Sequence, residues 1–271
     1  YGVVSHRFQI FPINYLNIIK QKIELKNNAL LRTGSHVSKK IDKSISGNKV
    51  NVKEIELSKN VKLYYSPSLN IDIDWNAKKI DIEKKLFSEF VVIAGTSKKQ
   101  PLFENWDIKM FSDPNSGIQS KMFSLVDETG INSCLTLVNL ELARIKIYSE
   151  NLNCEDSVNI VFSIGQLDTV EIFNSISDGL DVDDSNIRVN KAVIFKARMD
   201  CVDLGKGSYY IGELTTYECK NPLSVDFDTN IILEKLTNYR KNQWNIDSEK
   251  FISDPFNCSK RNENNGLCLV K

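Results

Sequence analysis

Two carboxylates, Asp200 and Glu213, lie in neighbouring apolar segments that the sequence predicts to be paired strands. Residues 193–202 and 209–216 are rich in β-branched and aromatic side chains, and residues 205–208 between them supply turn residues. This pattern is typical of a β-hairpin. We therefore expect the hairpin to bring the two acidic groups to one surface.

The same hairpin places two cations beside the carboxylates. Lys196, Arg198 and Asp200 alternate onto one face of the first strand, and Glu213 and Thr215 share one face of the second. In metal-dependent nucleases, carboxylates at this distance hold Mg²⁺ or Mn²⁺, and a lysine two residues after the glutamate assists the attacking hydroxide. Here Thr215 stands at the lysine position, and the guanidinium of Arg198 competes with a metal for the carboxylate oxygens. The pattern indicates a nuclease-like site without a cofactor.

The elements around this hairpin predict an α+β fold. Apolar spacing predicts a helix over residues 81–90, an acidic start and a basic end predict a second helix over residues 226–244, and the segment FVVIAG predicts a buried strand. Strands outnumber helices, so we expect mixed central β-sheets flanked by helices in a single domain over residues 1–271. No internal repeat is recognised, and residues 1–54 are not placed in this fold.

Composition limits the possible function classes. The 271 residues are 41% hydrophobic and 26% charged, with a formal net charge of zero. A protein that binds nucleic acid mainly through phosphates is usually basic, so RNA binding would require a local patch. No apolar run approaches the roughly 20 residues that span a bilayer, so no membrane partner is expected.

Cysteine and histidine usage favours an intracellular protein without a zinc site. Six cysteines lie far apart with no CxxC pair, which indicates reduced thiols, with a disulfide framework as the alternative. The only histidines, His6 and His36, are N-terminal, which argues against a catalytic histidine or a histidine zinc site.

Two further acidic features contain residue types that bind metals. Glu141 lies in the apolar segment 134–147, so it must reach solvent, a cation or a metal, unless it lies at the edge of an amphipathic element. The acidic segment 177–186 superficially suggests calcium ligands, but it lacks the glycine and the terminal glutamate of an EF-hand loop. Calcium is not predicted.

Two segments resemble motifs of a known family. KARMDCVD (196–203) and YYIGELTT (209–216) resemble two motifs of the DXO/Rai family of RNA 5′-end decapping and pyrophosphohydrolase enzymes. Weaker likeness in KNVKLYYSPS, FVVIAGTSKK and NLELARI extends the resemblance over roughly residues 55–271. The resemblance implies a DXO/Rai-like fold.

The resemblance also implies that the catalytic machinery is degenerate. It places the family's metal-binding carboxylates on Glu141, Arg198, Asp200 and Glu213. It places the catalytic lysine on Thr215 and the phosphate-contacting arginine on Ala94. These losses remove charge balance, hydroxide positioning and phosphate clamping. They imply an inactive member like those of the fly germline piRNA pathway: a nuclear protein that acts with the partners Rhino and Deadlock and protects nascent transcripts from processing and termination.

Two hypotheses stay open. The first is a catalytically inactive scaffold or RNA 5′-end-binding protein, in which Lys196 and Arg198 bind phosphate and Glu141, Asp200 and Glu213 are vestigial ligands; in a plainer version, Arg198 only neutralises the carboxylates and no RNA is bound. The alternative is an active Mg²⁺- or Mn²⁺-dependent RNA 5′-end pyrophosphohydrolase or decapping nuclease. In it, Lys196 replaces the missing lysine.

Overall fold

A computed structural model describes residues 52–86, 89–113, 133–226, 229–240, 243–246 and 251–252. Within these ranges the regular secondary structure consists of β-strands alone. The first group is β1 (Lys53–Ser58), β2 (Val61–Tyr65), β3 (Asn70–Asp74), β4 (Lys79–Lys84), β5 (Val91–Gly95), β6 (Leu102–Glu104) and β7 (Asp107–Ser112). The second group is β8 (Leu135–Val138), β9 (Glu141–Glu150), β10 (Asp156–Val161), β11 (Ile164–Ser175), β12 (Asp178–Asp183) and β13 (Ser185–Ala197). The last is β14 (Val202–Leu204), β15 (Gly207–Tyr217), β16 (Ser224–Val225), β17 (Thr229–Arg240), β18 (Gln243–Ile246) and β19 (Phe251–Ile252).

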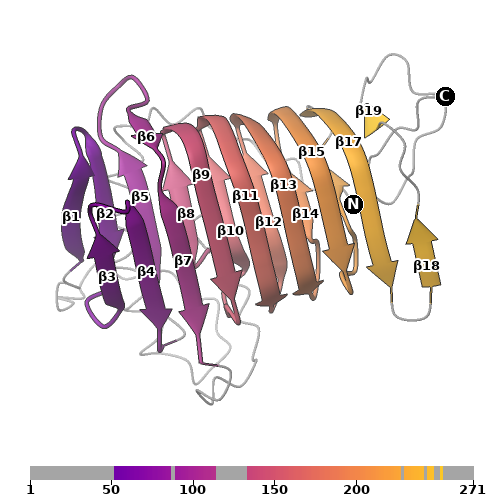
Figure 1. Ribbon diagram of the computed structural model, residues 1–271, viewed down its shortest axis with the longest axis horizontal. Coiled ribbons are helices and arrows are strands. Elements are labelled where there is room, and N and C mark those ends of the chain that lie inside the picture. The colour runs from indigo at the N-terminus through magenta and orange to yellow at the C-terminus, as the bar shows by residue number, and fades with distance from the viewer. Residues whose placement is uncertain are drawn as a thin grey trace, which may run out of the picture.

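The strands stack into a two-layered β-solenoid (Figure 1). Sheet A has the order β1-β2-β5-β8-β10-β12-β14-β16, and sheet B has the order β18-β17-β15-β13-β11-β9-β7-β4-β3. From β5 to β16 and from β4 to β17 the neighbours are parallel, because the chain alternates between the sheets and adds one coil at a time. Antiparallel strands lie at both ends of the stack.

The coils repeat every 22 residues in the C-terminal half. Ile164 pairs with Asn186, Ser185 pairs with Gly207, and Ser208 pairs with Asn230, so the partners are 22 residues apart in each case. The expectation that the chain has no internal repeat is therefore wrong. One residue per coil turns the chain out of sheet B with a positive φ: Asn151, Asn174, Lys196 and Glu218, with φ between 55° and 62°.

The core lies between the two sheets and consists of aliphatic columns. Along sheet B, Ile145, Leu167, Val189, Ile211 and Leu233 stand above one another in successive coils. All of them are buried. Each coil buries its apolar side against the next coil, which is how solenoid proteins gain stability.

The predicted α+β, DXO/Rai-like fold with flanking helices is wrong. The segment expected as a helix at 81–90 contains the end of β4, where Ile80 and Ile82 alternate into the core. The segment expected as a helix at 226–244 contains β17, in which Ile231 and Leu233 are buried and Ile232 between them is exposed. A period of two residues, which characterises strands, decides both segments. The buried strand predicted at FVVIAG is confirmed as β5.

The predicted hairpin is also wrong. Residues 193–197 end β13, residues 209–216 lie in β15, and these strands pair in parallel with β14 of sheet A between them along the chain. In this register Glu213 stands beside Lys191, and Thr215 stands beside Val193. Glu213 therefore does not lie opposite Arg198, and Thr215 does not lie opposite Lys196.

Two disulfides link neighbouring coils. Cys134 is bonded to Cys154, and Cys201 is bonded to Cys219. The expectation of reduced thiols is therefore wrong for these four residues; Cys258 and Cys268 lie outside the described residues. The alternative, a disulfide framework, is what the fold contains here.

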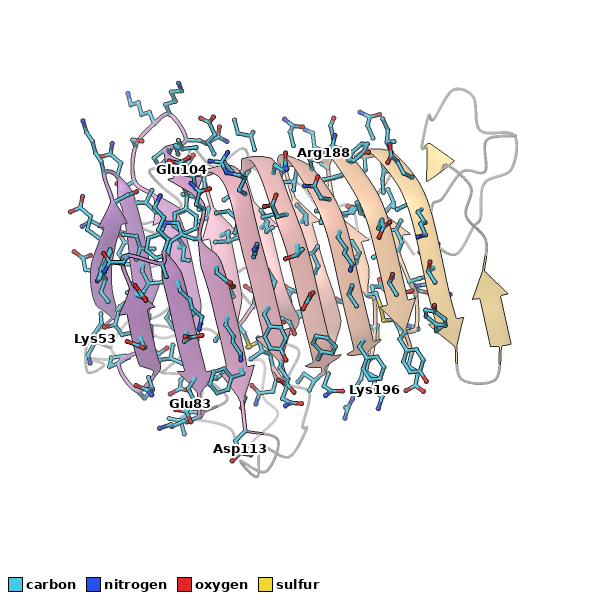
Figure 2. The ribbon with its side chains drawn as sticks, viewed as in Figure 1. Lys53, Glu83, Glu104, Asp113, Arg188 and Lys196 are labelled. Atoms are coloured by element: carbon cyan, nitrogen blue, oxygen red, sulfur yellow. A yellow bond between two sulfur atoms is a disulfide. The ribbon has the colours of Figure 1, made fainter. Side chains whose placement is uncertain are left out.

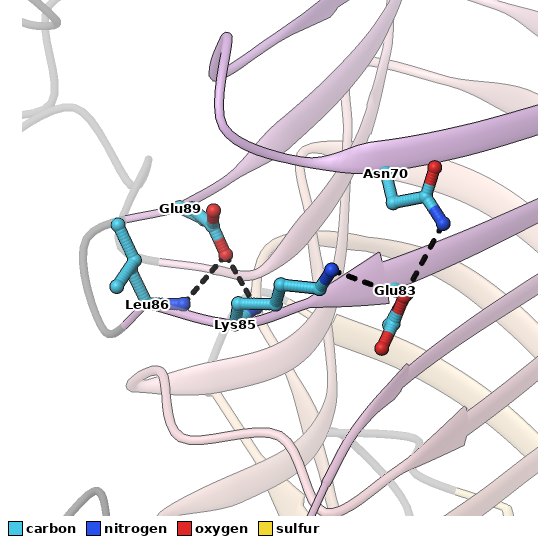
Figure 3. Close-up of polar contacts among 5 residues, drawn as sticks. All are labelled: Asn70, Glu83, Lys85, Leu86 and Glu89. Carbon is cyan, nitrogen blue, oxygen red and sulfur yellow. Dashed lines mark hydrogen bonds and ion pairs between the residues drawn. The ribbon is translucent and has the colours of Figure 1, made fainter. Parts of the chain in front are cut away.

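Glu89 fixes the passage from β4 towards β5 (Figure 3). Its Oε2 accepts hydrogen bonds from the backbone N–H groups of Lys85 at 2.6 Å and Leu86 at 2.7 Å. On the neighbouring surface, Glu83 pairs with Lys85 at 3.6 Å and accepts a hydrogen bond from Asn70 at 3.2 Å. A buried carboxylate thus replaces the strand partners that the backbone loses at this turn.

The part of the chain that the structure describes contains no helix that is long and apolar enough to cross a membrane.

Candidate binding surface

The outer face of sheet B carries two depressions at opposite ends of its strands. Arg188 marks one end of β13 and Lys196 the other (Figure 2). One depression surrounds Gly212 and is called the Gly212 groove below. The other contains Lys196 and Arg198 and is called the corner pocket.

The Gly212 groove forms where two consecutive residues of each coil face outward. These pairs are Asn190–Lys191 in β13, Gly212–Glu213 in β15 and Glu234–Lys235 in β17. Because Gly212 has no side chain, the outward column has a gap between Asn190 and Glu234. A Cβ atom at Gly212 would come within 2.6 Å of the Asn190 carbonyl oxygen, so the glycine also permits close approach of the coils.

Charged and polar groups of both kinds line this gap. The groove has a volume of about 430 Å³ and is lined by Arg188, Asn190, Tyr210, Gly212, Glu213, Glu234 and Lys235. This volume falls within the range of about 300–1,000 Å³ that is usual for small-molecule sites. Two cations and two carboxylates balance, so the lining favours neither a strong anion nor a divalent cation.

Contacts within the groove fix its central aromatic ring. The guanidinium carbon of Arg188 lies 3.9 Å from the centroid of the Tyr210 ring, and Arg188 Nε donates to Asn190 Oδ1 at 3.0 Å. A hydrogen bond with the Glu234 carboxylate raises the pKa of Tyr210, with burial as the second cause. Lys235 Nζ lies 3.5 Å from Glu213 Oε1. The tyrosine hydroxyl is thus protonated at neutral pH and donates its proton to the Glu234 carboxylate.

The corner pocket brings together the two residues that the sequence marks as phosphate-binding candidates. Lys196 and Arg198 line it with Glu218, Asn174 and Ser175, and its volume is about 360 Å³. Lys196 Nζ lies 4.0 Å from the Glu218 carboxylate, so one of the two cations is partly neutralised.

The other predicted site residues lie apart from this pocket and from one another. Glu213 is on the outer face of β15, whereas Asp200 is bridged to Asn221 beside sheet A and accepts a hydrogen bond from that side chain. Glu141 begins β9, and Ala94 is fully buried in β5. Among the described residues no group of three or more His, Cys, Asp or Glu side chains could hold a metal ion. The geometry that would make Glu141, Asp200 and Glu213 a metal cage is not present.

A ladder of aromatic rings runs across sheet B beside the corner pocket. Its members are Tyr148, Phe173, Phe195, Tyr217 and Tyr239, and their neighbouring centroids are 4.5–6.3 Å apart. The most closely packed pair is Phe195 and Tyr217, whose rings are parallel within 4°. The other neighbouring rings are tilted by 37–41° to one another, and the contacts of the ladder stabilise the stack of coils.

Sheet A carries columns of acidic residues. Asp156 pairs with Asp178, and Asp178 Oδ1 accepts a hydrogen bond from the backbone N–H of Asp200 at 2.7 Å. Asp181 pairs with Asp203 in the next coil. Burial, reinforced by neighbouring carboxylates, raises the pKa of Asp203 to about 6, and burial raises the pKa of Asp178 to about 6.

These raised pKa values predict that the protein gains stability on mild acidification. Folded Asp178 binds its proton near pH 6, whereas the unfolded chain does so near 3.8, so the folded state binds more protons between these values. The free energy of unfolding should therefore rise as the pH falls from 7.5 to 5.5, by on the order of 1 kcal/mol for this group. Thermal melts of the wild type and of Asp178→Asn over this range measure it. The variant should show a flatter dependence, and equal slopes would contradict the assignment.

No family model, curated protein or solved structure matches this chain. The resemblance to the DXO/Rai family, and to its degenerate fly member Cutoff, is thus neither supported nor refuted by known proteins. Apart from Glu213, the residues of the Gly212 groove were not predicted from the sequence. Their common signal is the 22-residue spacing that aligns Asp168, Asn190, Gly212 and Glu234.

Proposed function

We propose that this protein is a non-catalytic recognition module that binds a neutral, hydroxyl-rich ligand, such as a glycan, in the Gly212 groove. The observation that carries the proposal is the gap at Gly212, bordered by balanced donors and acceptors on a rigid, regularly repeating face. Asn190, Arg188 and Lys235 can donate to hydroxyl oxygens, and Glu213 and Glu234 can accept from hydroxyl hydrogens. A ligand with a strong charge would meet an opposing group of like charge in the same groove.

The disulfides support a setting outside the reducing cytosol and nucleus. Disulfides such as Cys134–Cys154 and Cys201–Cys219 persist in secreted or lumenal proteins and are rare where thiols are kept reduced. Glycans are abundant in the same compartments. Location and ligand class are thus consistent with one another.

A glycan array of neutral oligosaccharides, followed by calorimetric titration of the best binder, tests the proposal. Glu234→Leu replaces an acceptor at the border of the gap with an apolar side chain, so binding should weaken at least about tenfold. Glu171→Gln, on the outer face of the same sheet beside Val193 and outside the groove, is the matched control. The proposal fails if no neutral oligosaccharide binds, or if both variants bind as the wild type does.

A second candidate rests on the corner pocket. Since Lys196 and Arg198 line one cavity, we also propose that it accepts an anionic group, which retains the phosphate-binding part of the RNA 5′-end expectation. Catalytic inactivity, a nuclear location and partnership with Rhino and Deadlock stay predictions of the resemblance alone. Binding of a 5′-triphosphate RNA that is lost in the Lys196→Ala/Arg198→Ala variant would support this candidate, and binding unchanged in the variant would exclude it.

A further inference from the structure

The outer face of sheet A begins with an apolar patch. Tyr64, Phe90, Val92, Ala94, Val138 and Val161 form a hydrophobic cluster that is separate from the core. In β5, Val92 and Ala94 alternate with Val91 and Ile93, which belong to the core, so the patch lies on the side of the sheet that faces away from sheet B. Despite this outward direction, Val92 and Ala94 have no exposed surface and Val138 is 1% exposed.

No described strand or helix accounts for this burial. Every strand of the described ranges belongs to sheet A or to sheet B, and sheet B lies on the opposite side. Further along the face, Thr136 and Asn159 also have no exposed surface, although they alternate with core residues such as Leu137 and Val158. Because the residues of the patch are nevertheless almost fully buried, part of the chain other than the described strands must cover this face, as is usual for apolar patches in soluble proteins.

The face changes from apolar to acidic along the solenoid axis. Val138 and Val161 are followed in the same row by Asp183, and Asn159 is followed by Asp181 and then Asp203. Carboxylates stacked in adjacent coils repel one another, so cations in the occupant would stabilise them. An occupant that is apolar at one end and basic at the other would match both parts.

The first 51 residues of the chain have this character. Residues 8–19, FQIFPINYLNII, are largely apolar, and residues 1–51 contain nine Lys or Arg against two Asp or Glu, a net charge of +7. Because the whole chain has 35 of each, residues 52–271 carry the opposite charge of −7. The zero net charge of the protein is therefore the sum of a basic segment, residues 1–51, and an acidic remainder, residues 52–271.

The point of attachment places this segment beside the patch. Val52, the first described residue, packs against the apolar patch. From β2 to β14 the face spans five strand spacings, about 24 Å at roughly 4.8 Å each. An extended chain of this length reaches well over about 100 Å, so the segment can cover the whole face.

We propose that residues 1–51 dock intramolecularly on the outer face of sheet A, with apolar residues on the patch formed by Val92, Ala94 and Val138 and with lysines beside Asp181 and Asp203. The segment then acts as a lining that shields the acidic columns and leaves sheet B as the free recognition face.

Zero-length carbodiimide cross-linking of the full chain, read by mass spectrometry, tests this proposal. The reagent joins a carboxylate to an amine in direct contact. Lysines among Lys20, Lys22, Lys26, Lys39, Lys40, Lys43 and Lys49 should be joined to Asp181 or Asp203. In a mixture of ¹⁴N- and ¹⁵N-labelled protein, these cross-links should lie within one molecule.

Other occupants give different products. Cross-links from Lys121 would indicate the segment 114–132, those from Lys260 or Lys271 the C-terminal residues, and mixed-isotope products a second copy; any of these as the main product overturns the proposal. Failure of the segment's lysines to cross-link to the face overturns it too.

A variant of the full chain provides an independent readout. Asp181→Lys/Asp203→Lys should accelerate tryptic cleavage within residues 1–51 about tenfold, because the segment spends more time detached. Glu171→Lys/Glu213→Lys on sheet B is the matched control and should leave that rate unchanged. Circular dichroism establishes that both variants keep the strand content, and equal cleavage rates in a folded charge-reversed variant contradict the docking.

Discussion

Leu167→Ala is expected to lower the free energy of unfolding by about 3 kcal/mol. Leu167 has no exposed surface and stands between Ile145 and Val189 in the column that crosses the coils. The substitution removes apolar contact and leaves a cavity that the rigid stack of coils can fill only in part. Chemical denaturation monitored by circular dichroism measures the loss, with Val193→Ala on the half-buried outer face of β13 as the control.

The solenoid adds a spatial signature to this prediction. Coils contact mainly their neighbours, so the loss should be concentrated around β9, β11 and β13. Amide hydrogen exchange should become faster in these strands and change less in β3 and β4, at the N-terminal end of sheet B. Uniform acceleration over both regions would show that the described coils unfold as one cooperative unit, and a loss below that of Val193→Ala would contradict the column.

The strands were easier to predict than their arrangement. The apolar run around Val91–Gly95 identifies β5, since a short, continuous β-branched segment has few other solutions. In the segment 226–244 the charge distribution misled, because an acidic start and a basic end also match a helix macrodipole. The alternation of buried Ile231 and Leu233 with exposed Ile232 is the strand signal, and the outward pair Glu234–Lys235 interrupts it.

The repeat was present in the sequence but is carried by few residues. Phe173, Phe195, Tyr217 and Tyr239 are spaced by 22, as are Asp156, Asp178 and Asp200. Between them the core positions require only an aliphatic side chain, so the column of Val170, Ala192, Leu214 and Leu236 contains three different residue types. Parallel pairing over this distance has no local turn signal such as a hairpin has, so a hairpin was inferred instead.

The candidate site was predicted only where neighbours in the chain remain neighbours in space. Lys196 and Arg198, two residues apart, do share the corner pocket. Asp200 and Glu213 were expected together, but Asp200 lies beside sheet A and Glu213 lies in sheet B, because β14 and the turns around it separate them. The Gly212 groove depends on residues 22 apart and could be found only once the coil length was known.

Removal of the Cys134–Cys154 disulfide is expected to destabilise the protein by about 3 kcal/mol, given the chain-entropy cost of a loop of this length. The bond closes a loop with a sequence separation of 20 and joins the coil of β8 to that of β10. Both cysteines are buried, so Cys134→Ala/Cys154→Ala keeps the volume change small while it frees the unfolded chain.

Denaturation of the double variant and of the wild type, with and without reductant, measures this effect. The wild type without reductant should be the most stable, and reductant should lower the stability of the variant less than that of the wild type, because only Cys201–Cys219 remains to be reduced among the described bonds. Alkylation under denaturing conditions without reductant is the control: Cys134, Cys154, Cys201 and Cys219 should stay unmodified in protein produced in an oxidising compartment. If all four were alkylated, the coils would be held by packing alone, and the argument that places this protein outside the reducing cytosol and nucleus would lose its basis.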